Sequence, residues 1–182
     1  MKSPIYLDYN ATTPVAPEVV EAIRPFLVEH FGNPSSSHVY GLSARQAVAE
    51  ARASVAALIN AKQNEIFFTG SATEANNLAL LGVANASGQT RRHLVVSAIE
   101  HPAVMQPAQH LREMGWDLTV VPVDSYGRVD PHAVAAAVRS DTALVSIMHA
   151  NNEIGTIQPI AEISRLIKPM GVLPVSWARR CV

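Results

Sequence analysis

Hydrophobic residues occur in two alternating patterns over most of the chain. Short apolar runs, typical of buried strands, alternate with longer stretches whose apolar residues recur at helical spacing. The strands predicted in this way span 65–68, 93–97, 117–121, 142–147 and 172–175, and the helices span 73–86, 102–114, 131–139 and 159–168. Runs such as Leu94-Val95-Val96 are apolar on both faces. This combination favours the α/β class, with a mostly parallel sheet and helices on both faces.

The N-terminal third follows a different pattern. Residues 1–16 have the composition of a loop apart from Ile5-Tyr6-Leu7. A helix is predicted to begin at Pro17, because proline is favoured at the first helical position. A polar loop at 32–38 then precedes an alanine-rich helix predicted over 42–59.

The turn that precedes helix 73–86 carries small and hydroxylated residues from Thr69 to Thr73. The start of a helix has unpaired backbone N–H groups and a partial positive charge, so a phosphate fits there. Gly70 allows close approach of the backbone, and the Ser71 and Thr73 hydroxyls can donate to phosphate oxygens. The same residues also fit an ordinary helix cap, and no P-loop or dinucleotide fingerprint is present.

Three of the predicted strands end in polar loops. These loops span 69–73, 97–102 and 148–155. Because the carboxyl ends of parallel strands meet at one edge of a sheet, we expect the loops to converge in one cleft. The cleft would combine hydroxyl and amide groups with the His101 imidazole and the carboxamides of Asn151 and Asn152. Each residue also has a plainer interpretation, since His101 can cap the following helix and the asparagines can serve as turn residues.

Composition narrows the function classes. The chain has 182 residues, a net charge of −1 and a hydrophobic content of 48%, which is typical of a globular protein without a basic surface for nucleic acid. No apolar run approaches the ~20 residues of a membrane span, and no signal peptide is predicted. The single cysteine excludes a disulfide framework and favours the cytoplasm. The histidines and this cysteine show no metal-ligand spacing, so no metal site is expected.

Five motifs occur in a characteristic order. They are Tyr6-Leu7-Asp8-Tyr9-Asn10-Ala11-Thr12-Thr13-Pro14, Phe31-Gly32-Asn33-Pro34-Ser35-Ser36, Ala72-Thr73-Glu74, Glu100-His101 and Asn151-Asn152-Glu153-Ile154-Gly155. In sequence and order, they resemble the motifs of the cysteine desulfurases, which are pyridoxal-phosphate (PLP) enzymes of aminotransferase class V. The resemblance runs from about residue 5 to about residue 173.

The resemblance implies a fold-type I large domain in a homodimer that converts L-cysteine to L-alanine. The sulfur passes to an enzyme persulfide and then to an acceptor protein, for example in iron–sulfur cluster assembly. By the same resemblance, Ala72 and Thr73 hold the PLP phosphate through backbone N–H and hydroxyl groups. His101 stacks on the pyridine ring and serves in proton transfer, and Asn152 donates a hydrogen bond to the ring hydroxyl oxygen. The loop at Asn33 lines the substrate entrance.

Three elements of the family's chemistry are not found in the sequence. Trp177 stands where the Asp that pairs with the pyridine nitrogen is expected, and no lysine follows Lys168. Lys2, Lys62 and Lys168 are not placed like the Schiff-base lysine, and Cys181 is not placed like the persulfide cysteine. We therefore expect this chain to lack desulfurase activity, and to bind PLP at most weakly and without covalent attachment.

Domain assignments follow from the same comparison. Residues 1–16 are expected to form the N-terminal segment of the small domain, 17–173 a partial PLP-binding large domain, and 174–182 a tail unlike the family. Two strands that separate strand 65–68 from strand 172–175 in the family are missing, so the sheet is expected to be incomplete. Either strand 65–68 repacks or a dimer covers the gap. Two alternatives are a non-catalytic remnant that dimerises or binds a partner, and a selenocysteine-lyase-like enzyme.

Overall fold

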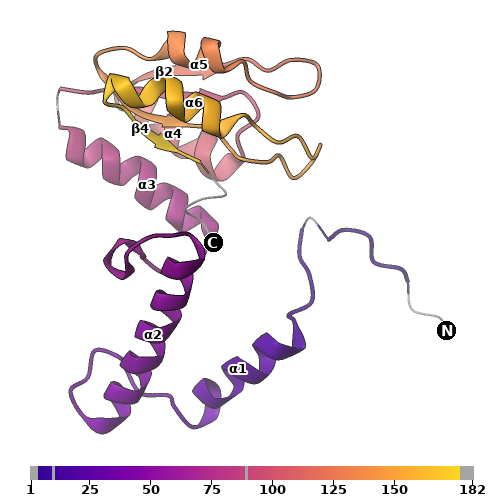
Figure 1. Ribbon diagram of the computed structural model, residues 1–182, viewed down its shortest axis with the longest axis vertical. Coiled ribbons are helices and arrows are strands. Elements are labelled where there is room, and N and C mark those ends of the chain that lie inside the picture. The colour runs from indigo at the N-terminus through magenta and orange to yellow at the C-terminus, as the bar shows by residue number, and fades with distance from the viewer. Residues whose placement is uncertain (1–3, 10, 89, 177–182) are drawn as a thin grey trace. The chain divides into compact units, whose positions relative to one another are not determined.

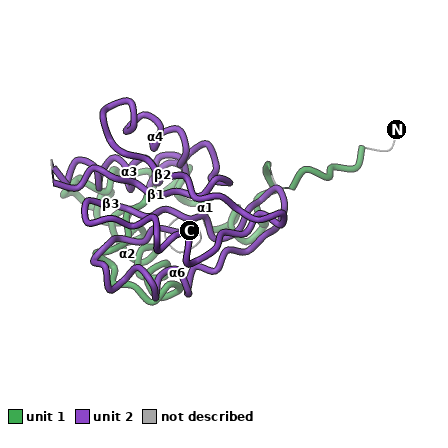
Figure 2. The backbone as a smooth tube through the Cα atoms, turned by 90° about the horizontal axis from the view of Figure 1, so that it is seen from above, with its two compact units in different colours: residues 1–68 green, residues 69–182 purple. Residues whose placement is uncertain are grey.

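The computed structural model describes residues 4–9, 11–88 and 90–176. Trp177 and Cys181, on which two of the expectations rest, lie outside these residues. The chain divides into two compact units, Met1–Phe68 and Thr69–Val182, which Figure 2 shows in green and purple.

The first unit consists of helices and loops. It contains α1 (Pro17–Val28), α2 (Val39–Leu58) and the 3-10 turn η1 (Gln63–Glu65). Pro17 occupies the start of α1 as predicted, and the helix continues through Pro25. The polar loop before α2 is tied to that helix, because the Arg45 guanidinium donates to the carbonyl oxygens of Pro34 at 2.9 Å and Ser36 at 3.1 Å.

Glycine at position 41 makes the approach of this loop to α2 possible. A Cβ atom on Gly41 would lie only 2.5 Å from the Ser36 carbonyl oxygen and 2.6 Å from that of Asn33. Such contacts are too short for any side chain, so the loop at Asn33 can pack on α2 only where the helix has no Cβ.

The second unit is a parallel sheet with helices on both faces (Figure 1). Its strands are β1 (His93–Ser97), β2 (Asp117–Val121), β3 (Thr142–Ser146) and β4 (Leu173–Val175), in the spatial order β2-β1-β3-β4. Its helices are α3 (Ala72–Ser87), α4 (Pro102–Glu113), α5 (Pro131–Ala137) and α6 (Ile160–Ile167), followed by the 3-10 turn η2 (Lys168–Met170). The predicted α/β class, the parallel sheet and four of the five strands are confirmed, with ends that shift by one residue at most.

Two hydrophobic clusters occupy the two faces of the sheet. Leu94 and Val96 of β1 pack with α3 and α4, whereas Val95 packs with α5 and α6. Leu144 and Val145 of β3 divide in the same way. Neighbouring residues of a strand point to opposite faces, so apolar side chains at consecutive positions are what a sheet covered on both sides requires.

The short strand β4 forms one edge of the sheet. Pro174 lies opposite Val145 of β3, and the Ile147 N–H donates to the Val175 carbonyl oxygen at 3.1 Å. Pro174 and Val175 are the first residues of the tail assigned to 174–182, and they also complete β4, in agreement with the strand predicted over 172–175.

The strand predicted at 65–68 is wrong. Glu65 ends the turn η1, residues 66–68 form no strand, and Phe67 and Phe68 are 76% and 50% exposed. An apolar run becomes a strand only where a neighbouring strand accepts its backbone hydrogen bonds, and no described strand pairs with it. The expected repacking of this segment onto the sheet is therefore not found among the described residues, whose sheet consists of β2, β1, β3 and β4. The alternative expectation, a covering dimer, stays a prediction.

Candidate functional site

The N-terminus of α3 is capped in a way that leaves two backbone N–H groups directed outward. The Ser71 hydroxyl accepts a hydrogen bond from the Glu74 N–H at 3.1 Å, and the Glu74 carboxylate accepts one from the Gly70 N–H at 2.7 Å. The N–H groups of Ala72 and Thr73 are bonded to no acceptor in the part of the chain that the structure describes. The capping interpretation of Ser71 is confirmed, whereas binding of an anion by the N–H groups of Ala72 and Thr73 stays a prediction.

His101 lies directly before α4 and acts as its cap. Its Nδ1 atom accepts a hydrogen bond from the Ala103 N–H at 3.0 Å. This contact places the lone pair on Nδ1 and holds the imidazole ring in one orientation at the helix start. The capping interpretation of His101 is correct.

A cleft of about 620 Å³ lies between α3 and α4. Thr73 and Asn77 line it from α3, and His101, Gln106 and His110 line it from the α4 side. Its volume is within the range of small-molecule sites. Residues of two of the three predicted loops therefore line one cleft, although only the loop of His101 follows a strand.

The third loop does not line this cleft. Asn152 is exposed, and its Nδ2 lies 3.5 Å from the Glu153 carboxylate. Asn151 is a turn residue, because its Oδ1 accepts from the N–H groups of Glu153 at 2.8 Å and Ile154 at 3.0 Å. The cleft lining also omits Ala72, whose contribution is a backbone N–H group at the helix start.

Glu100 is a residue that sequence reasoning treated only as part of a motif. Its side chain is 8% exposed, and its Oε1 accepts from the Ser97 hydroxyl at 2.6 Å and the Met148 N–H at 2.8 Å. Burial raises the pKa of this carboxyl, and the two hydrogen bonds oppose the rise. Its contact with Met148, far along the chain, leaves no signal in the local sequence that could have identified its role.

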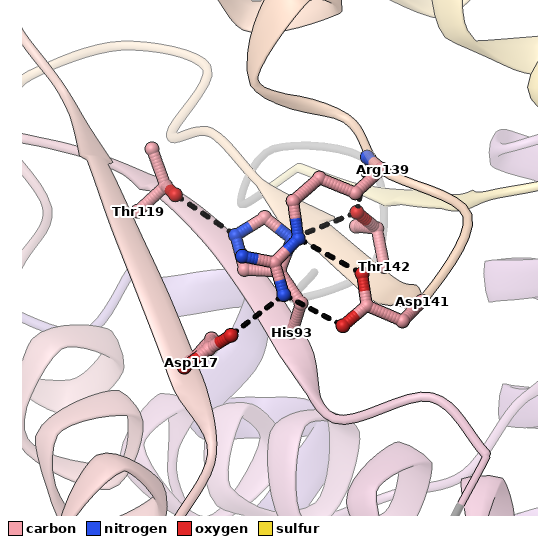
Figure 3. Close-up of polar contacts among 6 residues, drawn as sticks. All are labelled: His93, Asp117, Thr119, Arg139, Asp141 and Thr142. Carbon is pink, nitrogen blue, oxygen red and sulfur yellow. Dashed lines mark hydrogen bonds and ion pairs between the residues drawn. The ribbon is translucent and has the colours of Figure 1, made fainter.

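A second polar cluster lies at the opposite edge of the sheet, where the strands begin (Figure 3). The His93 ring is fully buried and contacts Thr142 through Nδ1 and Thr119 through Nε2, both at 2.8 Å. Beside it, the Arg139 guanidinium bonds Asp117 and Asp141, each at 2.6 Å. Burial lowers the pKa of His93, and the positive charge of Arg139 lowers it further. This cluster joins the starts of three strands and is separate from the cleft.

The buried His93 should make folding stability depend on pH. A histidine whose pKa is lowered on folding binds a proton more readily in the unfolded chain, so stability falls as pH drops below the unfolded value of about 6.5. We expect the free energy of unfolding, measured with urea, to decrease between pH 7.5 and pH 5.5. His93→Gln should reduce this dependence. Comparing the two proteins cancels the contribution of Glu100, and equal slopes would contradict the assignment.

Metal-binding groups and membrane-spanning helices were both searched for among the described residues. Among them, no group of three or more His, Cys, Asp or Glu side chains is arranged to hold a metal ion. No described helix is both long enough and apolar enough to cross a membrane.

Comparison with known proteins places this chain in a family. Residues 5–176 match the model of the aminotransferase class-V family. A cysteine desulfurase IscS of Dictyoglomus turgidum is 52% identical over 168 residues, which cover 92% of this chain and 43% of the relative. The cysteine desulfurase IscS 1 of Archaeoglobus fulgidus is 50% identical over 170 residues, which cover 93% and 44%. The chain thus spans less than half the length of the curated relatives it matches.

Solved structures agree with this assignment. A NifS-like protein superposes with a TM-score of 0.91 at 40% identity, over 94% of this chain and 48% of that one. The apo cysteine desulfurase of Thermococcus onnurineus gives 0.85 at 28% identity, over 94% and 43%. The fold matches the predicted PLP-dependent fold-type I architecture, in part. The chain belongs to the aminotransferase class-V family and is a relative of its cysteine desulfurases.

Proposed function

We propose that this chain forms part of a cysteine-desulfurase-type PLP site and binds the cofactor's phosphate at the N-terminus of α3. The observation that carries the proposal is the pair of N–H groups on Ala72 and Thr73, with Thr73 lining the same cleft as His101. A phosphate accepts hydrogen bonds from such donors and gains from the positive end of the helix dipole. The described residues therefore fit the phosphate of PLP.

Each proposed site residue has one task. Ala72 and Thr73 hold the phosphate, the Thr73 hydroxyl adds a donor, and the His101 ring packs on the pyridine ring with Nε2 placed for proton transfer. When bound, PLP supplies an electron sink for the substrate. Asn152 is assigned to the ring hydroxyl on family resemblance alone, since it does not line the cleft.

Attachment of the cofactor is proposed to be non-covalent in this chain. Lys168, in the same unit as the cleft, begins η2 and does not line the cleft. A lysine that forms a covalent link to a bound aldehyde must reach it from the site. The chain is therefore proposed to hold PLP by its phosphate and ring contacts.

Substrate, assembly and location follow the family as further proposals. We propose L-cysteine as substrate of the complete site, a sulfur-acceptor protein as partner, a homodimer as assembly, and the cytoplasm as location. The relatives described above are cysteine desulfurases or NifS-like proteins, so the selenocysteine-lyase and remnant alternatives gain no support from them. The assignment of 1–16, 17–173 and 174–182 to separate parts also stays a proposal, beside a compact-unit boundary after Phe68.

Ala72→Pro tests the phosphate site. Proline at the first helical position removes one N–H while preserving the helix, and Ser71 already has the extended backbone that precedes proline (φ −164°, ψ 163°). We expect the variant to melt at or above the wild-type temperature and to bind PLP about 10-fold more weakly, the effect of one charge-assisted hydrogen bond.

Titration of PLP followed by its absorbance checks this result, and pyridoxal, which lacks the phosphate, serves as the matched ligand. Wild type should prefer PLP over pyridoxal, and Ala72→Pro should lose much of this preference. Equal PLP affinity in the two proteins would place the phosphate elsewhere.

A further inference from the structure

One buried carboxyl group joins the two loops that carry the candidate site residues. Glu100 belongs to the turn between β1 and α4, yet its Oε1 accepts the Met148 N–H at 2.8 Å, two residues beyond the end of β3. The same oxygen accepts the Ser97 hydroxyl at 2.6 Å, where β1 ends. A single atom therefore fixes the end of β1 to the start of the loop that leads to Asn152.

The neighbours of Glu100 transmit this attachment to His101. The Glu100 N–H closes the turn on the Ser97 carbonyl oxygen at 3.4 Å, and His101 follows as the next residue and caps α4. A second link runs between the loops, because the Asn151 Nδ2 lies 3.4 Å from the Ile99 carbonyl oxygen. The position of the His101 backbone, and with it the orientation of its ring, thus depends on the contacts that hold the Glu100 side chain.

We propose that Glu100 is the positioning residue of this site, which sets the place of the His101 ring by locking the β1–α4 turn to the β3 loop. This proposal rests on the proposed function in one respect, which is that His101 contacts a cofactor. It assigns no contact between Glu100 and substrate or cofactor, since the carboxyl is buried beneath the turn.

The second carboxyl oxygen indicates which variant is informative. Oε2 is buried and has no hydrogen-bond partner among the described residues. Burial also raises the pKa of Glu100, which favours a neutral side chain. Glu100→Gln keeps the accepting oxygen but places an amide where Oε2 lies, so it preserves the attachment while costing some stability. Glu100→Ala removes the attachment.

The experiment follows His101 in the chain without cofactor. In ¹³C/¹⁵N-labelled protein, the ring Cε1–H signal of His101, identified by its loss in His101→Gln, and the hydrogen exchange of the Ala103 amide report the capped ring. We expect Glu100→Gln to leave the ring signal in place and keep Ala103 protected. Glu100→Ala should displace the signal and speed exchange of Ala103 by about 10-fold or more, as for a lost hydrogen bond.

Gln158→Ala is the matched control. Gln158 is also buried and makes two hydrogen bonds across loops, to the Val129 N–H at 2.9 Å and the Gly127 carbonyl oxygen at 2.7 Å. Its removal should lower the melting temperature as Glu100→Ala does, but leave the His101 signal unchanged. A displaced His101 signal in Gln158→Ala, or an unchanged one in Glu100→Ala, would overturn the proposal.

If Glu100→Ala does not fold, the His101 ring signal is measured in Ser97→Ala, which removes one of the two hydrogen-bond donors to Glu100. A displaced ring signal then supports the proposal and an unchanged signal overturns it. PLP titration is read separately: about 10-fold weaker binding in Glu100→Ala with rescue by Glu100→Gln extends the effect to the cofactor. If wild type binds no PLP, the proposed function fails while the His101 measurements still judge Glu100.

Discussion

Incubated with L-cysteine and PLP, the purified 182-residue chain is expected to release no sulfide above a protein-free control. Desulfuration by this family requires a lysine amine that attaches the cofactor and moves the substrate's α-proton, as the resemblance implies. Lys168, the described lysine of the second unit, lies at a 3-10 turn and does not line the cleft. Methylene-blue detection of sulfide, together with alanine analysis, measures the outcome.

The assay needs a positive control and an independent check on attachment. The Dictyoglomus turgidum relative, assayed in parallel, shows that the conditions support turnover. Borohydride reduction of the chain with PLP, followed by peptide mass analysis, should give no adduct or scattered labelling of Lys2, Lys62 and Lys168. Sulfide in excess of the protein concentration, or a single adduct at one lysine, would contradict the prediction.

Leu144→Ala is expected to destabilise the second unit by about 2–5 kcal/mol, the cost of a cavity at a fully buried leucine. Leu144 is 1% exposed and lies in β3, which pairs with β1 on one side and β4 on the other. Its side chain packs in the cluster formed with α3 and α4. Urea denaturation followed by circular dichroism measures the change in the free energy of unfolding.

Leu173→Ala is the matched control for this substitution. Leu173 pairs with Leu144 in the register of the sheet but is 55% exposed. The same deletion of methyl groups should therefore cost about 0.5 kcal/mol or less. Similar losses of stability at the two positions would contradict the difference in burial between Leu144 and Leu173.

The sheet could be predicted from the sequence because its strands are apolar on both faces. Consecutive residues such as Leu94 and Val95 have no solvent-facing position, and helices alternate with the strands, so burial between two helical layers follows. The run before Thr69 has the same composition, with Phe67 and Phe68, but forms no strand. An apolar run indicates that its residues are buried. A strand also needs a neighbouring strand for its backbone hydrogen bonds, and the local sequence does not show whether one is available.

The site was predictable to a smaller extent. The predicted meeting of Thr73 and His101 in one cleft is confirmed, but only His101 follows a strand, so the predicted reason applies to one of the two residues. The roles of Glu100 and Asn151 depend on contacts between loops about fifty residues apart in the chain, as between Glu100 and Met148 or Asn151 and Ile99. Such pairings follow from the final packing of the sheet, so no spacing in the sequence indicates them.

Pro174 bears on how copies of this chain can associate. Because the Val175 carbonyl oxygen points to β3, the backbone of Pro174, one residue earlier, faces the outer side of β4. Proline has no N–H, so the centre of this open edge offers no donor to an incoming strand. Fibril-like growth by strand addition is thereby obstructed at β4. A dimer of this chain is therefore not expected to continue the backbone ladder across the β4 edge.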